Sequence, residues 1–167
     1  MPDATLTTGD GRPVIRLERP LRHPAAEVWR ALTDPEALTG WFPGTIITDV
    51  WEVGAPLTFR EEGHPDSSGM VLELEEARLL SFTWWGDVLR FGLTPQPDGG
   101  TLLVLTDELD ADTAARNAAG WEVCLGRLLD GDGADIEWGP RFDHYADLFE
   151  PALGAQAGPP PGYGDAD

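Results

Sequence analysis

The stretch 32–44, LTDPEALTGWFPG, decides how the chain is laid out, because it places two large aromatic residues on a connector one turn long. A helix runs up to Asp34-Pro35, and the proline then opens a second, very short helix, where its missing N–H costs nothing. Trp41 and Phe42 follow this short helix side by side. Two explanations stay open: the rings close the edge of a core, or they form the wall and lid of a pocket.

The segments around this connector predict an α+β domain. Residues 14–21 alternate between apolar and polar and predict a first strand, while residues 23–34 predict the helix that leads into the connector. A long helix near 112–130 and a last helix near 140–150 close the order. Between the connector and the long helix, the alternation and the turn residues predict strands near 45–50, 56–62, 68–76, 79–85, 87–94 and 100–108.

This order predicts a curved antiparallel sheet wrapped around the long helix. Ala114, Ala118, Trp121, Leu125 and Leu128 recur at helical spacing and form one apolar stripe. A long twisted sheet curls rather than staying flat, so we expect the stripe to face its concave side. The gap between sheet and helix is the expected cavity.

The domain boundaries follow from composition. We expect one domain over residues 14–153, including the extra C-terminal helix. The polar residues 1–13 predict a flexible N-terminus, and the Pro/Gly-rich residues 154–167 predict a disordered tail.

Charge limits the partners that this chain can bind. The net charge is −19, from 11 basic and 30 acidic residues, and every basic residue is arginine. A field this negative repels phosphate backbones and anionic lipids, so we expect no nucleic-acid or membrane partner. No stretch approaches the about 20 apolar residues that span a bilayer. The start of the sequence lacks the pattern of a signal peptide, and a single cysteine fits a reducing compartment, so the expected location is the cytoplasm.

Metal and cofactor sites are not expected. His23, His64 and His144 are scattered, and their spacing does not predict convergence on one ion. Residues 130–137, DGDGADIE, lack the oxygen ligand and the glycine of a calcium loop at its fifth and sixth positions. Cys124 lies beside the apolar stripe without a histidine nearby in sequence, which favours a buried, inert thiol.

Four stretches together resemble a known family. They are HPAAEVWRALTDPEALTGWFPG (23–44), GMVLELEEARLLSFTWW (69–85), GTLLVLTDEL (100–109) and AAGWEVCLGRLLDG (118–131). In their order and spacing the chain resembles the START/Bet v 1-like superfamily, also called SRPBCC or helix-grip proteins. Within it the chain is similar to the branch related to the C-terminal domain of the activator of Hsp90 ATPase. The match spans roughly residues 14–130, and Asp107 stands where the family commonly has a histidine.

The resemblance implies a helix-grip fold with a cavity for an apolar small molecule. Plain core packing is the alternative for any single residue, whereas the set as a whole favours a partly open pocket. The candidate ligand-binding residues are Trp41, Phe42, Phe59, Met70, Leu72, Phe82, Trp84, Phe91, Leu103, Leu105, Trp121 and Leu125.

Three functions remain in competition. The favoured one is binding of a hydrophobic small molecule, lipid-, polyketide- or aromatic-like, by a monomer or a homodimer. The second is a polyketide cyclase or aromatase-like enzyme, with Asp107 and Tyr145 behind it as the candidate catalytic residues. The third is an interaction domain like the Hsp90 activator, with a chaperone partner. A binder predicts a cavity without a deep ionisable group, an enzyme predicts an inward acid with a shifted pKa, and an interaction domain predicts a filled core.

Overall fold

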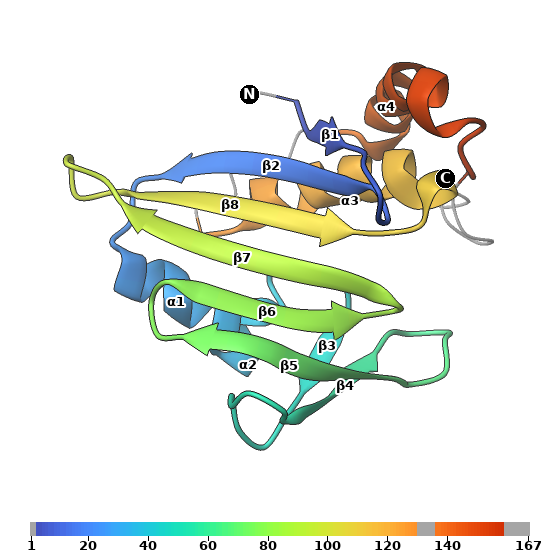
Figure 1. The fold of residues 1–167 in the computed structure, drawn as a ribbon. Helices are drawn as coiled ribbons and strands as arrows, with labels where there is room; N and C mark the ends of the chain where they lie inside the picture. Colours follow the sequence, from blue (N-terminus) through green and yellow to red (C-terminus); the bar gives the residue numbers. More distant parts are fainter. Residues whose placement is uncertain (1–2, 130–135, 159–167) are drawn as a thin grey trace.

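The fold is known from a computed structural model, which describes residues 3–129 and 136–158. Figure 1 shows the arrangement of the elements. In chain order these are β1 (Thr5–Thr7), β2 (Val14–Leu21), α1 (Ala25–Thr33), α2 (Pro35–Leu38), β3 (Thr45–Ile47), β4 (Pro56–Arg60), β5 (Ser67–Glu75), β6 (Leu79–Trp84), β7 (Asp87–Pro95), β8 (Thr101–Glu108), the 3-10 turn η1 (Ala111–Thr113), α3 (Ala114–Arg127) and α4 (Trp138–Leu153).

The strands form one antiparallel sheet that curves around the long helix. Their order across the sheet is β1-β2-β8-β7-β6-β5-β4-β3. Helices α1, α2 and α3 lie on the same side of this sheet, and α4 lies further out at one end (Figure 1). This arrangement confirms the predicted α+β helix-grip fold, with two short helices following the strand β2.

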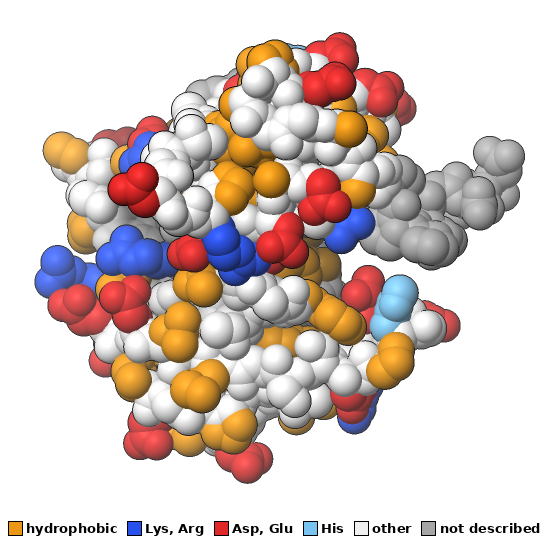
Figure 2. Space-filling view, turned by 45° about the vertical axis from the view of Figure 1, so that its right-hand side comes forward, with side chains coloured by type: hydrophobic (Ala, Val, Ile, Leu, Met, Phe, Trp, Pro, Cys, Tyr) orange, Lys and Arg blue, Asp and Glu red, His pale blue; other side chains and the backbone are white. Residues whose placement is uncertain are grey.

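Alternation along the strands sets which side chains face the helices. In β8, Leu103, Leu105 and Asp107 are each buried, and the residues between them are partly exposed. Arg90 on β7 points outward and binds Glu73 on β5, with Nε 3.2 Å from Oε2. Figure 2 shows a band of basic and acidic side chains across the surface, as expected for a sheet with one wet face.

Helix α3 is buried on two faces. The apolar stripe at Ala114, Ala118, Trp121 and Leu125 is buried, as its spacing predicts. A second set of mostly small residues is also buried, because α4 packs against α3 on that side. It consists of Ala115, Ala119, Glu122 and Gly126.

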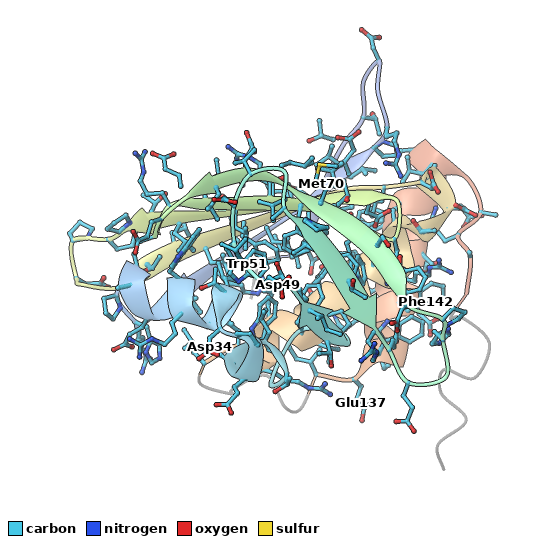
Figure 3. The ribbon with its side chains drawn as sticks, turned by 90° about the horizontal axis from the view of Figure 1, so that it is seen from below. Asp34, Asp49, Trp51, Met70, Glu137 and Phe142 are labelled. Atoms are coloured by element: carbon cyan, nitrogen blue, oxygen red, sulfur yellow. The ribbon has the colours of Figure 1, made fainter. Side chains whose placement is uncertain are left out.

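The expectation that Met70 and Leu72 line the interior is wrong. Their side chains are 48% and 38% exposed, whereas Val71 between them is fully buried. The pairing of β5 with β6 shifts between Val71 and Glu73. A bulge of this kind changes which residues face the core, and simple alternation in the sequence does not reveal it. In Figure 3, Met70 lies on the opposite side of the sheet from Trp51.

The two ends of the described chain are also more ordered than expected. Residues 5–7, which the sequence pattern places in a flexible N-terminus, form β1, which pairs with β2. Gln156 accepts a hydrogen bond from the backbone N–H of Ala115 at 2.9 Å and donates to the carbonyl of Ala111. The start of the predicted tail therefore caps α3. Residues 159–167 of that tail lie outside the described residues.

Substitution of Gly69 tests the packing of β5. A Cβ at this position would lie 2.6 Å from Cε2 of Phe59 and closer still to the carbonyl oxygen of Thr83. Gly69→Ala should therefore lower the free energy of unfolding by about 1–3 kcal/mol, measured by urea denaturation. Gly139→Ala on α4 is the matched control, since its Cβ meets open space, and it should be neutral or raise stability by up to about 1 kcal/mol. Equal midpoints for Gly69→Ala and the wild type would contradict this packing.

Candidate functional site

An aromatic cluster fills the space between the sheet, the connector after α2 and helix α3. Phe42 is its centre, with ring centroids 6.1 Å from Phe82, 5.9 Å from Trp84 and 5.9 Å from Trp121. Trp41 contacts Phe42 edge-on at 5.5 Å, and its indole Nε1 donates to the carbonyl of Ala31 on α1 at 2.9 Å. The connector thus bridges the sheet and the long helix through one ring.

The remaining inward candidates complete this cluster. Phe82 stacks with Phe59 and with Phe91, each at a centroid distance of 6.0 Å. Leu103, Leu105 and Leu125 are buried in the same core. Apart from Met70 and Leu72, the structure therefore brings the predicted residues together. Whether they bind a ligand remains a prediction.

Two surface hollows lie away from the aromatic cluster. One, of about 330 Å³, separates α1 from the β5–β6 turn and is lined by Trp29, Arg30 and Glu76 among others. The other, of about 230 Å³, lies on the outer face of the sheet beside Arg78 and Arg90. Neither is lined by a ring of the cluster. A ligand between sheet and helix would therefore need the rings to move.

A buried pair of carboxyl groups borders the aromatic cluster. Asp107 on β8 is fully buried, and its Oδ2 accepts a hydrogen bond from Nε1 of Trp121 at 2.9 Å. Asn117 on α3 bridges the pair, because its Nδ2 lies 3.0 Å from Oδ2 of Asp87 and 3.4 Å from Oδ2 of Asp107. This polar site therefore combines two side chains of α3 with one carboxyl group from β7 and one from β8.

Burial favours the neutral form of Asp107. It raises the pKa of Asp107 well above its usual value, and the negative charge of Asp87 and a hydrogen bond with that carboxyl raise it further. Burial also raises the pKa of Asp87, against the opposing effects of the hydrogen bond with Asp107 and of the charge on Arg12. Oδ2 of Asp107 accepts two N–H groups, whereas Oδ1 is buried without a hydrogen-bond partner among the described residues.

Arg12 contacts the Asp87 carboxyl of this pair from its solvent side. Its Nη2 lies 3.7 Å from Oδ1 of Asp87 and 3.2 Å from Oδ1 of Asp110, and its Nη1 donates to the carbonyl of Gly86 at 2.9 Å. The Asp87 side of the pair therefore faces an arginine, whose charge lowers the pKa of that carboxyl.

Tyr145, the second candidate catalytic residue, belongs to a different cluster from Asp107. Its hydroxyl donates to Oε1 of Glu122 at 2.6 Å and accepts the backbone N–H of Ala4 at 2.7 Å. Burial and this bond to Glu122 raise the pKa of Tyr145 to about 12. The reason is α4, whose packing places Tyr145 on the far side of α3 from the sheet.

Ion pairs around Glu122 join the two ends of the chain to α3. Arg141 on α4 binds Glu122 through Nε at 2.5 Å and Nη2 at 2.9 Å, and it also reaches Asp3 at 2.7 Å. Arg19 on β2 lies 3.8 Å from Oε1 of Glu122. Sequence reasoning missed this network. The available signal was a glutamate directly after Trp121, at helical spacing from the small residues of α3.

Three further features bear on a metal site, a membrane span and a reactive thiol. Within residues 3–129 and 136–158, no three His, Cys, Asp or Glu side chains gather in a way that holds a metal ion. In the same part of the chain, no helix is long and apolar enough to cross a membrane. Burial raises the pKa of Cys124 to about 12, so its thiol stays protonated at neutral pH.

Comparison with known families explains this architecture. Residues 22–130 match the family described as Activator of Hsp90 ATPase homolog 1-like protein. The chain belongs to this family. The matched region contains the aromatic cluster and the acid pair, whereas β1, β2 and α4 lie outside it.

Solved structures show the same fold. A conserved protein of unknown function from Enterococcus faecalis is 23% identical, with 87% of this chain and 89% of that chain covered and a TM-score of 0.76. CalU16 from Micromonospora echinospora is 26% identical, with 88% and 97% covered and a TM-score of 0.68. The Aha1 dimer from Colwellia psychrerythraea is 19% identical, with 70% and 96% covered and a TM-score of 0.58. Comparison with curated proteins found no match.

Substitution of Asp107 tests whether the pair holds a proton. An aspartate in the unfolded chain loses its proton near pH 4, whereas folded Asp107 keeps it to higher pH. Folding therefore binds a proton above pH 4, and the wild type loses stability as the pH rises through that window. Asp107→Asn mimics the neutral acid and removes this dependence. Its stability relative to the wild type should rise by up to about 1.4 kcal/mol per pH unit.

Urea denaturation at pH 5.5, 6.5 and 7.5 measures this difference. Asp66→Asn is the matched control, since the hydrogen bond from Arg60 lowers the pKa of Asp66, which is then ionised in both states throughout this range. The difference between Asp66→Asn and the wild type should not change with pH. If the stability difference between Asp107→Asn and the wild type also does not change with pH, Asp107 is ionised in the folded protein.

Proposed function

We propose that this protein binds a hydrophobic small molecule, lipid-, polyketide- or aromatic-like, between the sheet and α3. The observation that carries the proposal is the position of Phe42. Its ring comes from a short connector, yet it stands between Phe82 on the sheet and Trp121 on the helix. A ring held by a connector rather than by a strand or helix can leave without breaking either layer.

The ligand would take the place of that ring. Phe42 is held at the backbone by the hydrogen bond from its N–H to the carbonyl of Leu38, which belongs to the four-residue helix α2. Movement of this short segment would expose Phe82, Trp84 and Trp121 to an incoming apolar group. The released contacts are replaced by contacts with the ligand, so the apolar area withdrawn from water is largely retained.

The location of the protein and its macromolecular partners are also proposals. The lack of a nucleic-acid partner rests on the net charge of −19, and a cytoplasmic location rests on the single cysteine. The Aha1 relative is a dimer, and the family name refers to Hsp90 activation, so a homodimer and a chaperone partner remain alternatives.

Binding can be tested with N-phenyl-1-naphthylamine, a neutral apolar fluorophore, and with native mass spectrometry of the freshly purified protein. We expect saturable fluorescence enhancement with one site per chain. Trp121→Ala should weaken binding about tenfold, because it removes one wall of the cluster.

Trp138→Ala is the matched control. Trp138 is an indole on α4 that stacks on Phe142, outside the aromatic cluster, so its loss should leave the dissociation constant unchanged. Equal weakening by both variants would point to general destabilisation. Absence of saturable binding, together with no co-purifying molecule in the mass spectrum, would overturn the proposal.

A second candidate is a cyclase or aromatase-like enzyme, and the protonated acid pair favours it. Asp107 would give its proton to a ligand oxygen as a general acid, with Asp87 stabilising the proton before transfer. Tyr145 has no part in this version, because its hydroxyl bonds to Glu122. If Asp107→Asn binds the ligand as the wild type does while a chemical change of the ligand disappears, the enzyme would be favoured over the binder.

A further inference from the structure

One indole in the aromatic cluster has an unused donor. Nε1 of Trp84 is buried, and no acceptor lies within hydrogen-bonding distance among the described residues. An indole N–H is a donor without acceptor capacity, so a buried one needs an oxygen or another acceptor. Leaving it unmet costs the free energy of its lost hydration.

Three other indoles that pack in or against the core have acceptors. Trp41 donates to the carbonyl of Ala31, Trp51 to the carbonyl of Thr33, and Trp121 to Asp107, at 2.7–2.9 Å. The buried Nε1 of Trp84 has no such partner among the described residues. Trp84 lies where the proposed ligand would sit, with its ring 5.9 Å from Phe42 and 5.3 Å from Trp121.

The charges near Trp84 limit which acceptor fits. Trp84 on β6 pairs in register with Asp87 on β7, so the negative charge of the acid pair lies on the neighbouring strand. Arg12 faces Asp87 at 3.7 Å and also contacts Asp110. Arg116 acts on Asp87 as a further, more distant positive charge. A carboxylate or sulfate placed at Trp84 would meet a buried negative charge whose arginine partner is already shared between two aspartates.

We propose that the ligand is a neutral, largely apolar molecule with a hydrogen-bond acceptor oxygen, such as a ketone or quinone, and that this oxygen accepts the N–H of Trp84. This inference rests on the proposed binding function and names the chemical class that the site takes. The ring system replaces Phe42, and the oxygen meets the donor that the protein leaves without a partner. Anionic analogues of the same shape are rejected by the acid pair.

A matched set of three tricyclic probes tests this class. Fluorene and 9-fluorenone share one shape and differ by a carbonyl oxygen, and fluorene-9-carboxylate carries a negative charge. Quenching of tryptophan fluorescence measures each dissociation constant. We expect fluorenone to bind about five- to tenfold more tightly than fluorene, the gain from one hydrogen bond to a buried donor, and the carboxylate to bind more weakly than both.

Two conservative variants assign the effect to one indole. Trp84→Phe keeps a ring but removes the N–H. The ratio of the dissociation constants of fluorene and fluorenone should therefore fall to about one, while fluorene still binds. Trp41→Phe removes an indole N–H from the same aromatic cluster, but that N–H is already bonded to Ala31. Its preference for fluorenone should remain that of the wild type. If Trp84→Phe fails to fold, the wild-type ratio of fluorenone to fluorene remains a test by itself.

The possible results separate the two proposals. Equal binding of fluorene and fluorenone by the wild type would overturn the acceptor class and leave hydrophobic binding intact. Tighter binding of the carboxylate would overturn the requirement for a neutral ligand. A fluorenone preference that survives Trp84→Phe would assign the donor to another residue and overturn this inference. If no probe binds the wild type, both the inference and the proposed function fail.

Discussion

The hydrogen bond from Trp121 to Asp107 is the constraint on which the rest of this structure depends. It joins the middle of α3 to the inner face of β8 at 2.9 Å, where neither partner is reached by water. Once it forms, the Trp121 ring lies against Phe42, Trp84 and Phe91. One side chain thus joins the helix to the sheet and packs against the ring of the connector.

Burial of that pair has a second consequence for the chain. Two carboxyl groups close together disfavour each other's ionisation in a dry environment, which contributes to the raised pKa of Asp107, and Arg12 faces the other carboxyl, Asp87. The family resemblance places a histidine where Asp107 stands. Here the carboxyl group at this position is buried beside Asp87 and accepts the N–H of Trp121.

The ends of the chain stabilise the helix from its other side. Glu122 follows Trp121 directly, so α3 presents an apolar ring to the sheet and a carboxylate to α4. Arg141, Tyr145 and the backbone of Ala4 meet around that carboxylate and hold β1 and α4 in place. A buried charge of this kind is costly unless it is fully paired, which explains why segments outside the family match pack so closely here.

The sequence by itself determined the order of strands and helices along the chain from β2 onward, the stripe of α3 and most of the inward-facing aromatic residues. These follow from local periodicity, because a strand buries every second residue and a helix every third or fourth. It did not predict β1, the outward position of Met70 and Leu72, or the separation of Tyr145 from Asp107. A three-residue strand carries too little alternation to detect, and the bulge after Val71 reverses the face without changing composition. Only tertiary packing brings Asp87, Asp107 and Asn117 together, because these partners come from separate elements and no local pattern relates them.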